Sequence, residues 1–405
     1  MDFGTLPEKL FREAAELVMR TGAETDEQVM AIVEDRVLAH VKRATCGEMC
    51  ILSDRIFGKM RGELGSLSYL LKDEKISEIM VNGPEEIFVE RGGTIMRLPD
   101  RFDSREDLER VIRRIAASVH REISELNPIL DARLSDGSRV SAVLGNVAIG
   151  GPSVTIRRFG KDRIGMADML ENRTLPRECA EDLIDLVAAG CNLFVSGGTS
   201  SGKTTFLNAL SAYIPAEERV IVIEDSLELD FEGTQNIVRL ECREANSAGR
   251  GKITLRDLIR ASLRMRPDRL VVGEVRGEEA ADMLQALNTG HSGMSTGHGN
   301  SIRGMLRRLE AMYLSGSQIP LDAIRMQIVE AVDVMVHLER FADGRRRVTE
   351  VQELCGYADG EYVLNPLYLM DGKLELRSTG RKLRNDIKLR LKGIRNDRLQ
   401  ELPAE

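Results

Sequence analysis

The sequence predicts an α/β fold in which two domains follow an N-terminal helical segment. Apolar residues recur at helical spacing near the N-terminus, a middle segment combines strand patterns with an amphipathic helix, and a later segment alternates buried-type strands with helices. We expect a helical segment at 1–65, a smaller α/β domain at 66–159, a hinge linker at 160–165, a larger α/β domain at 166–376 and a basic tail at 377–405.

Composition excludes several classes of protein. The chain has 405 residues, of which 42% are hydrophobic and 30% are charged, the balance of a globular protein. Its net charge of -8 gives no field that attracts nucleic acid, and aromatic residues, on which base-stacking domains rely, make up only 4%. Six scattered cysteines, and the lack of any run of roughly 18 apolar residues, favour a reduced, cytoplasmic protein. We expect no stable nucleic-acid binding.

The N-terminal segment is expected to be helical. Two sets of apolar residues each keep to one helical face: Leu10, Ala14, Leu17 and Val18, then Val29, Ile32, Val33 and Val37. Cys46 and Cys50 lie one helical turn apart, a spacing at which two thiolates can share a metal, but no second pair with ligand spacing follows. We therefore expect both cysteines to be small core residues.

The middle domain is predicted from a change to strand periodicity. Apolar and polar residues alternate from 79 to 89, and a turn at 91–93 precedes a return strand. The spacing of apolar residues then predicts an amphipathic helix over 108–119, followed by strands at 139–143 and 153–158. This pattern is typical of a compact α/β domain.

The larger domain is predicted to contain a largely parallel sheet. Its buried-type strands lie at 192–196, 219–224 and 269–273, with helical segments between them, and short strands flank later Asp-Gly turns. The tail from 377 to 398 is dense in Lys and Arg but keeps four apolar residues at helical spacing, which is typical of a solvated helix face.

A glycine-rich motif follows the first of these strands. Residues 197–204 match the phosphate-loop pattern G-x-x-x-x-G-K-[ST] at every position, and a helical pattern continues from there. At average residue usage the pattern arises about 0.01 times in a chain of this length. The residues expected to contact a nucleotide are Gly197, Gly198, Thr199, Ser200, Ser201, Gly202, Lys203, Thr204 and Thr205.

The chemistry of this loop suits a nucleotide with Mg²⁺. Glycines let backbone N–H groups turn toward a phosphate, and the helix N-terminus adds partial positive charge. Lys203 is expected to neutralise the β- and γ-phosphates, and the Thr204 hydroxyl to ligate Mg²⁺.

Acidic residues end two of the buried-type strands. Glu224 and Asp225 follow one of them, and Glu274 follows the next. Because ligands of open α/β sheets bind at the carboxyl ends of strands, we expect these acids beside the phosphate loop, where hydrolysis needs a metal clamp and a group that positions water. One such acid is more often a helix cap or a solvated residue, but two in one phosphate-loop domain favour the functional interpretation.

Two of the five histidines, His291 and His298, lie in one segment at 289–301 that is rich in Gly, Ser and Thr. The pair could bind zinc, but no third ligand lies nearby. Hydrogen bonding to a γ-phosphate suits the segment better, so both histidines are candidate nucleotide sensors.

Four elements thus follow one another along the chain: the phosphate loop, Glu224-Asp225, Gly273-Glu274-Val275-Arg276 and the double-histidine segment. Their order resembles that of the secretion-superfamily ATPases, the hexameric motors of type II and type IV secretion and of type IV pili. In that superfamily they are the Walker A, Asp box, Walker B and His box. Gly273 stands where most phosphate-loop enzymes carry Asp, which matches the superfamily, and Arg276 joins the candidate nucleotide-binding residues.

Within the superfamily the chain resembles the CpaF-type ATPases of Tad (Flp) pilus assembly. The resemblance rests on segments 78–84, 131–139, 155–159 and 263–277, and extends roughly from 65 to 340. The paired CxxC zinc motif of many type II secretion ATPases is absent from the sequence. The resemblance implies a RecA-like P-loop ATPase domain preceded by a smaller, PAS-like α/β domain.

The resemblance also implies an assembly. A homo-hexamer would hold the nucleotide between a subunit's two domains and its neighbour, and Arg139, Arg157 and Arg158 match positions from which arginines contribute. Guanidinium groups there would stabilise charge that develops on the γ-phosphate. The implied partner is a polytopic inner-membrane platform protein, with the chain cytoplasmic and peripherally associated with the inner face of the membrane.

These residues favour ATP hydrolysis, and the resemblance implies that it powers type IV (Tad/Flp-like) pilus assembly or type II/IV protein secretion. Lys203 and Thr204 would hold the phosphates and Mg²⁺, Glu224 is the first candidate for activating water, and Glu274 would lie near the metal. The two glutamates can exchange these roles, and His298 completes the candidate catalytic set. Two alternatives stay open: a nucleotide-gated adaptor or switch with negligible turnover, and a conjugation or nucleic-acid-transfer motor of the same superfamily.

Overall fold

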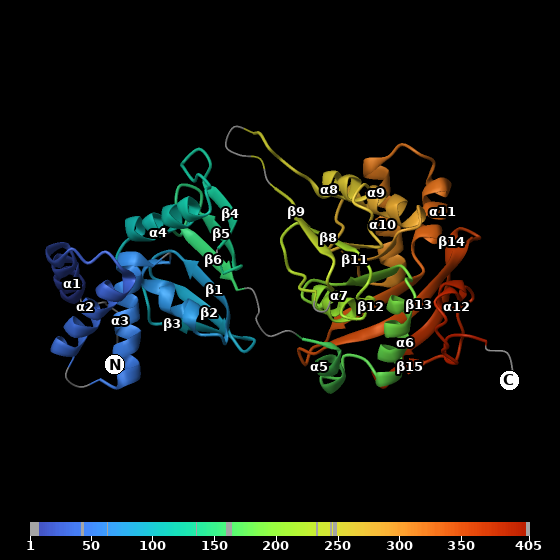
Figure 1. Ribbon diagram of the computed structural model, residues 1–405, viewed down its shortest axis with the longest axis horizontal. Helices are drawn as coiled ribbons and strands as arrows, with labels where there is room; N and C mark the ends of the chain where they lie inside the picture. Colours follow the sequence, from blue (N-terminus) through green and yellow to red (C-terminus); the bar gives the residue numbers. More distant parts are fainter. Residues whose placement is uncertain are drawn as a thin grey trace. The chain divides into compact units, whose positions relative to one another are not determined.

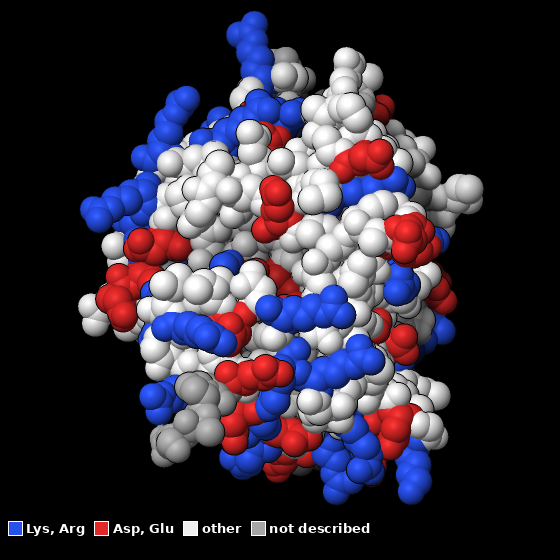
Figure 2. Space-filling view, turned by 90° about the vertical axis from the view of Figure 1, so that its right-hand side faces the viewer, with Lys and Arg blue, Asp and Glu red and all other residues white. Residues whose placement is uncertain are grey.

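The computed structural model describes residues 8–401 except 42–43, 63, 135, 159–163, 232–233, 244 and 246–248. It divides the chain into two compact units, 1–163 and 164–405 (Figure 1). Most of the predicted hinge at 160–165 lies outside the described residues. Acidic side chains are interspersed among basic ones on the face drawn in Figure 2. In the part of the chain described, no helix has the length and apolar character needed to cross a bilayer.

Three helices open the first unit, as their periodicity predicted: α1 (Glu8–Thr21), α2 (Asp26–His40) and α3 (Cys46–Arg61). Thr25 and Thr45 form capping boxes at the starts of α2 and α3. The prediction that Cys46 and Cys50 are core residues was wrong, because both are exposed. They lie on the side of α3 away from Leu52 and Ile56, which pack against the other two helices.

An antiparallel six-stranded sheet, ordered β3-β2-β1-β6-β5-β4, forms the rest of the first unit. It follows the 3-10 helix η1 (Gly65–Lys72). Its strands are β1 (Ile76–Asn82), β2 (Ile87–Arg91), β3 (Thr94–Leu98), β4 (Ile129–Arg133), β5 (Arg139–Val143) and β6 (Ser153–Arg157). Helix α4 (Arg105–Ser118) packs Leu108, Ile112 and Ile115 against the inward side chains of these strands. The predicted strands and amphipathic helix are thereby confirmed.

A nine-stranded sheet, ordered β15-β14-β13-β12-β7-β11-β10-β8-β9, forms the base of the second unit. Its parallel part consists of β12 (Val334–Arg340), β7 (Leu193–Gly197), β11 (Ser292–His298), β10 (Arg269–Val272), β8 (Val220–Glu224) and β9 (Ile237–Glu241). Strands β13 (Arg346–Ala358), β14 (Glu361–Met370) and β15 (Leu376–Ser378) extend it in antiparallel fashion. The carboxyl ends of the parallel strands therefore meet at one edge of the sheet.

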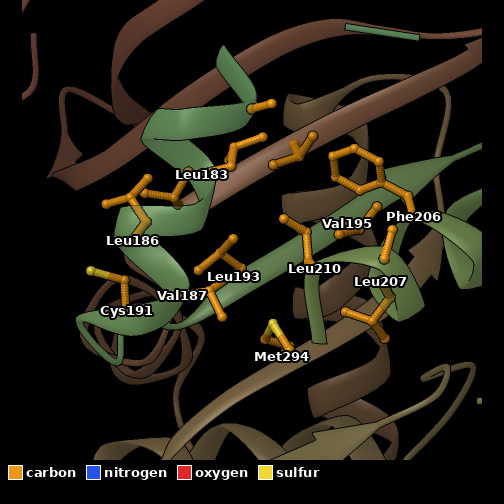
Figure 3. Close-up of a cluster of buried hydrophobic side chains, with 14 of the residues drawn as sticks. Leu183, Leu186, Val187, Cys191, Leu193, Val195, Phe206, Leu207, Leu210 and Met294 are labelled. Atoms are coloured by element: carbon orange, nitrogen blue, oxygen red, sulfur yellow. The ribbon is translucent and has the colours of Figure 1, made fainter. Parts of the chain in front are cut away.

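Helices cover both faces of this sheet. One face packs against α5 (Met166–Glu171), α6 (Arg177–Ala188), α7 (Lys203–Ser211) and α12 (Ile387–Leu391). The other packs against α8 (Leu255–Ser262), α9 (Glu279–Asn288), α10 (Ile302–Gly316) and α11 (Leu321–Ala331). Strand β7 shows the alternation that builds both cores: Leu193 and Val195 pack on the first face (Figure 3), and Phe194 packs on the second.

The basic tail folds onto the second unit instead of forming one solvated helix. Only 387–391 of the expected helical stretch is an α-helix. The buried carboxylate of Asp182 accepts hydrogen bonds from the Tyr368 hydroxyl (2.5 Å), Asn396 Nδ2 (2.9 Å) and Arg398 Nε (2.7 Å). The tail is held by interior acids as well as by apolar packing, so the expectation of a solvated helix face was wrong here.

Asp182 is therefore predicted to stabilise the second unit. We expect Asp182→Ala to lower the free energy of unfolding by about 3 kcal/mol, because buried donors lose their acceptor and Arg398 loses a buried partner. Glu181→Gln is the control: Glu181 meets Arg398 at the surface, and we expect a change below about 0.5 kcal/mol. Denaturant unfolding of both variants measures the difference, and equal losses would contradict the role of Asp182.

Candidate active site

The phosphate loop joins β7 to α7 at the carboxyl edge of the parallel strands. Gly202, the N-cap of α7, has a φ of 92°, a conformation that favours glycine. A Cβ at Gly198 would meet no atom within 4 Å, so the backbone is open to a ligand there. A Cβ at Gly197 would lie 2.4 Å from the Leu338 carbonyl oxygen, so this glycine is required by packing against β12.

Lys203 begins α7, and its side chain contacts the end of β11. Its Nζ donates a hydrogen bond to the carbonyl of Gly198 (2.9 Å) and lies 3.3 Å from Nδ1 of His298. Nε2 of His298 lies 3.1 Å from Oε1 of Glu274. A neutral imidazole with its proton on Nε2 satisfies both contacts, because Nδ1 then accepts from Lys203 and Nε2 donates to Glu274.

The electrostatics of the site favour this neutral histidine. Burial lowers the pKa of His298, and the charge of Lys203 lowers this pKa further, while Glu274 opposes the shift. Burial also lowers the pKa of Lys203, again against the opposing effect of Glu274. Arg276 lies 3.1 Å from Glu274 and 3.5 Å from Asp225, so acids and bases from several elements form one network.

Glu224 ends β8, and its side chain is only 3% exposed. Its Oε1 accepts hydrogen bonds from the backbone N–H groups of Glu228 and Leu229, both at 3.0 Å. Gly273 leaves the space that this carboxylate needs: a Cβ at position 273 would lie 2.9 Å from Cγ of Glu224. Glycine in place of the usual Asp therefore has a packing reason, since a side chain at 273 would displace Glu224.

The structure does not bring His291 to the phosphate loop. His291 precedes β11, whereas His298 ends this strand of 7 residues. Its Nδ1 lies 3.1 Å from the carbonyl oxygen of Pro267. An extended strand therefore separates the two histidines, and contact between His291 and a nucleotide stays a prediction. The same separation prevents the two histidines from binding one zinc ion together.

The three candidate arginines lie in the first unit. Arg139 pairs with Asp131 at 3.0 Å, and Arg158 donates hydrogen bonds to the carbonyls of Asp73 and Ile76. Arg157 is exposed at the end of β6. Contact between these arginines and a nucleotide stays a prediction.

Sequence reasoning missed two charged residues at the loop. Glu228 follows β8 and raises the pKa of Lys203 and of Arg276 by its charge.

Arg346 begins β13, and its Nε donates a hydrogen bond to the Ser200 carbonyl at 3.0 Å. No motif singles out Arg346, which stands in the run Arg345-Arg346-Arg347 and reaches the loop only through strand pairing.

The donors at the site fit Mg²⁺ better than a metal held by protein alone. Among the residues described, no group of three or more His, Cys, Asp or Glu side chains is placed to hold a metal ion. Mg²⁺ takes most of its ligands from substrate phosphates and water and needs only one or two from protein. Thr204, in the first turn of α7, and Glu274 are the residues that would provide them.

Sequence comparison identifies the family. Residues 61–360 match the family described as "Type II/IV secretion system protein", and the chain belongs to it. It is 33% identical over 313 residues to the conjugal transfer protein TrbB of Rhizobium radiobacter, across 76% of this chain and 93% of TrbB. It is 32% identical over 324 residues to the type IV secretion system protein PtlH of Bordetella pertussis, across 73% of this chain and 94% of PtlH.

Solved structures agree on the fold. The pilus retraction motor PilT with bound ADP matches with a TM-score of 0.51 at 20% identity, across 80% of this chain and 86% of PilT. The ATPase DotB of Legionella pneumophila matches with a TM-score of 0.51 at 20% identity, across 73% of this chain and 81% of DotB. The predicted α/β, RecA-like fold is thereby confirmed.

We expect Gly273→Ala to displace Glu224. The amides of Glu228 and Leu229 then lose a charged acceptor worth about 1.5 kcal/mol, so their hydrogen exchange should accelerate by about tenfold. NMR exchange measurements test this. Gly356→Ala in β13 is the control, because a Cβ there meets no atom within 4 Å. Unchanged exchange at 228 and 229 in Gly273→Ala would contradict the packing role.

The lowered pKa of His298 predicts a pH effect on stability. Below about pH 6.5 the unfolded chain protonates this histidine before the folded chain does, so stability falls as pH falls through the folded-state pKa. Urea unfolding at several pH values should show a steeper acid loss for wild type than for His298→Gln, and NMR titration should place the pKa below its usual value. Parallel stability profiles would contradict the lowered pKa of His298.

Proposed function

We propose that this chain is an ATP-hydrolysing motor that works as a homo-hexamer to power Tad (Flp)-type pilus assembly. The observation that carries the proposal is the contact chain from Lys203 through His298 to Glu274 and Arg276. A protein that only binds nucleotide needs the phosphate loop alone. Acids and a histidine from neighbouring strands add what hydrolysis needs, namely metal binding, water positioning and charge stabilisation.

In the proposed reaction water attacks the γ-phosphorus, the bond to the β–γ bridging oxygen breaks, and ADP and phosphate leave. Lys203 exchanges the Gly198 carbonyl for phosphate oxygens. Glu224, fixed by two backbone N–H groups, orients the water and takes its proton. Thr204 and Glu274 would hold Mg²⁺, which would neutralise charge on the phosphates. His298 and Arg276 respond to the γ-phosphate through their contacts with Glu274.

The finer parts of the proposal rest on the resemblance to CpaF-type ATPases. Its segments 78–84 and 263–277 support the Tad branch, and the lack of a paired CxxC motif in the sequence argues against the type II branch. In the proposed hexamer, Arg139, Arg157 and Arg158 act at a nucleotide. The ring would act on a polytopic platform protein, peripherally at the inner face of the cell membrane.

A conjugation motor is the second candidate. The observation that favours it is the 33% identity to a conjugal transfer protein, TrbB. A DNA-moving motor should hydrolyse ATP faster when single-stranded DNA is added, because translocation and turnover are coupled. A pilus motor should show no such stimulation.

Steady-state hydrolysis with Mg²⁺ tests the proposed function. We expect Lys203→Ala and Glu224→Gln each to lower turnover by about 10²–10³-fold, because each removes a group that acts on the transition state. Glu224→Gln should still bind ATP, and native mass should show six subunits. Lys373→Ala, in an exposed turn of the same unit, is the control. A monomer that binds ATP tightly and shows no turnover even with the platform protein would contradict the motor and favour the switch.

A further inference from the structure

We propose that the β12–β13 hairpin (334–358) forms a cationic wall of the nucleotide site, on the other side of the phosphate loop from His298 and Glu274. In this wall Arg346 positions the phosphate loop, and Arg346 together with Arg340 binds the diphosphate part that ATP and ADP share. The inference rests on the proposed nucleotide site and deepens it, because it adds binding residues that no sequence motif marks.

The hairpin touches the loop at both of its ends. Strand β12 runs parallel to β7 with Leu338 opposite Gly197, and β7 leads through the phosphate loop into α7. A Cβ on Gly197 would lie 2.4 Å from the Leu338 carbonyl oxygen, and a Cβ on Gly202 would lie 2.9 Å from Cδ of Arg346. Gly197 is therefore required by contact with the backbone of the hairpin, and the Arg346 side chain fills the space beside Gly202, whose φ of 92° itself favours glycine.

Arg346 fixes the orientation of one peptide group in the loop. Its Nε donates a hydrogen bond to the carbonyl of Ser200, whose φ of 57° is uncommon for a residue other than glycine. In a planar trans peptide, the N–H of Ser201 must point opposite to that carbonyl. This N–H makes only a long contact of 3.4 Å with the Gly198 carbonyl, so it remains available to a phosphate oxygen.

The positive charges of the hairpin favour binding of an anion. Arg340 and Arg346 form the last pair of the β12–β13 register, and both are exposed. Neighbouring Arg345 and Arg347 lie within 3.8 Å and 3.1 Å of Asp343, whereas Arg340 and Arg346 have no acidic partner among the residues described. Like charges directly opposite one another on paired strands repel. A phosphate group beside them would remove this repulsion and gain two guanidinium contacts.

The position of the hairpin in the sheet decides which part of the nucleotide it meets. Strand β12 lies on one side of β7, whereas β11 and β10, which lead to His298 and Glu274, lie on the other. The hairpin is therefore on the side away from the groups assigned to the γ-phosphate. Its arginines should bind ATP and ADP equally, and such uniform binding changes affinity without changing turnover at saturation.

Calorimetric titration with ADP, and with ATP in the Glu224→Gln background, tests the proposal. We expect Arg346→Ala to weaken both nucleotides by the same factor, about tenfold, and Arg340→Ala to weaken both by about threefold. Arg345→Ala is the matched control and should stay within about twofold. Arg346→Ala should also make ADP binding less dependent on salt, an effect that lost packing alone would not produce. Arg346→Lys should restore the salt dependence and only part of the affinity, because lysine keeps the charge but lacks the Nε donor.

Three results would overturn the proposal. Unchanged ADP affinity in Arg346→Ala would remove the arginine wall while leaving the proposed motor intact. Weakening of ATP alone would place these arginines at the γ-phosphate and refute the diphosphate assignment. A wild-type chain that binds neither nucleotide would refute this inference and the proposed site together. In contrast, ADP binding with the expected losses in a chain that never hydrolyses ATP would refute only the motor.

Discussion

The parallel pairing of β11 with β7 is the contact on which the candidate site depends. In its register His298 lies opposite Gly197, and this places the imidazole within 3.3 Å of Lys203. Strand β10 pairs with the other side of β11 and leads to Glu274, and β8 follows with Glu224. A shift of one residue would exchange the two faces of β11 and carry His298 away from the loop. The apolar cores on both faces of the sheet oppose such a shift.

The same pairing explains how a lysine and an arginine are kept beside two acids, Glu274 and Asp225. Lys203 loses solvation on burial, which lowers its pKa, and the charge of Glu274 partly compensates. Arg276 joins Glu274 to Asp225 and thereby connects the end of β10 to the turn after β8. The neutral His298 lies between a cation and an anion: its Nδ1 accepts a hydrogen bond from Lys203, and its Nε2 donates one to Glu274. Among the residues described, Lys203 has only uncharged hydrogen-bond acceptors, so an arriving phosphate would break no ion pair of Lys203 with them.

Much of this arrangement could be predicted from the sequence, and the rest depends on long-range pairing. The phosphate loop, Glu224 and Glu274 are found because each follows a short apolar strand, and parallel strands bring such ends to one edge. The separation of His291 from His298 could not be predicted, because the composition of 289–301 does not show that Ser292–His298 is one extended strand. Arg346 was missed because its contact with Ser200 spans 146 residues and arises only when β13 pairs with β12. The fold of the tail was missed for the same reason, since Asp182 lies far from Arg398 in sequence.

The glycines around the site are present for different physical reasons. Gly198 faces open space and suits the approach of a phosphate, as the motif implies. Gly197 and Gly202 are instead confined by the β12–β13 hairpin, and Gly273 by the side chain of Glu224. A glycine required by a protein neighbour couples the loop to that neighbour, because movement of the hairpin or of Glu224 changes the space that the glycine provides. The phosphate loop is therefore held from two sides, by a hairpin whose Arg340 and Arg346 have no acidic partner in the described part of the chain and by strands with catalytic candidates, and a nucleotide that binds it would bridge the two.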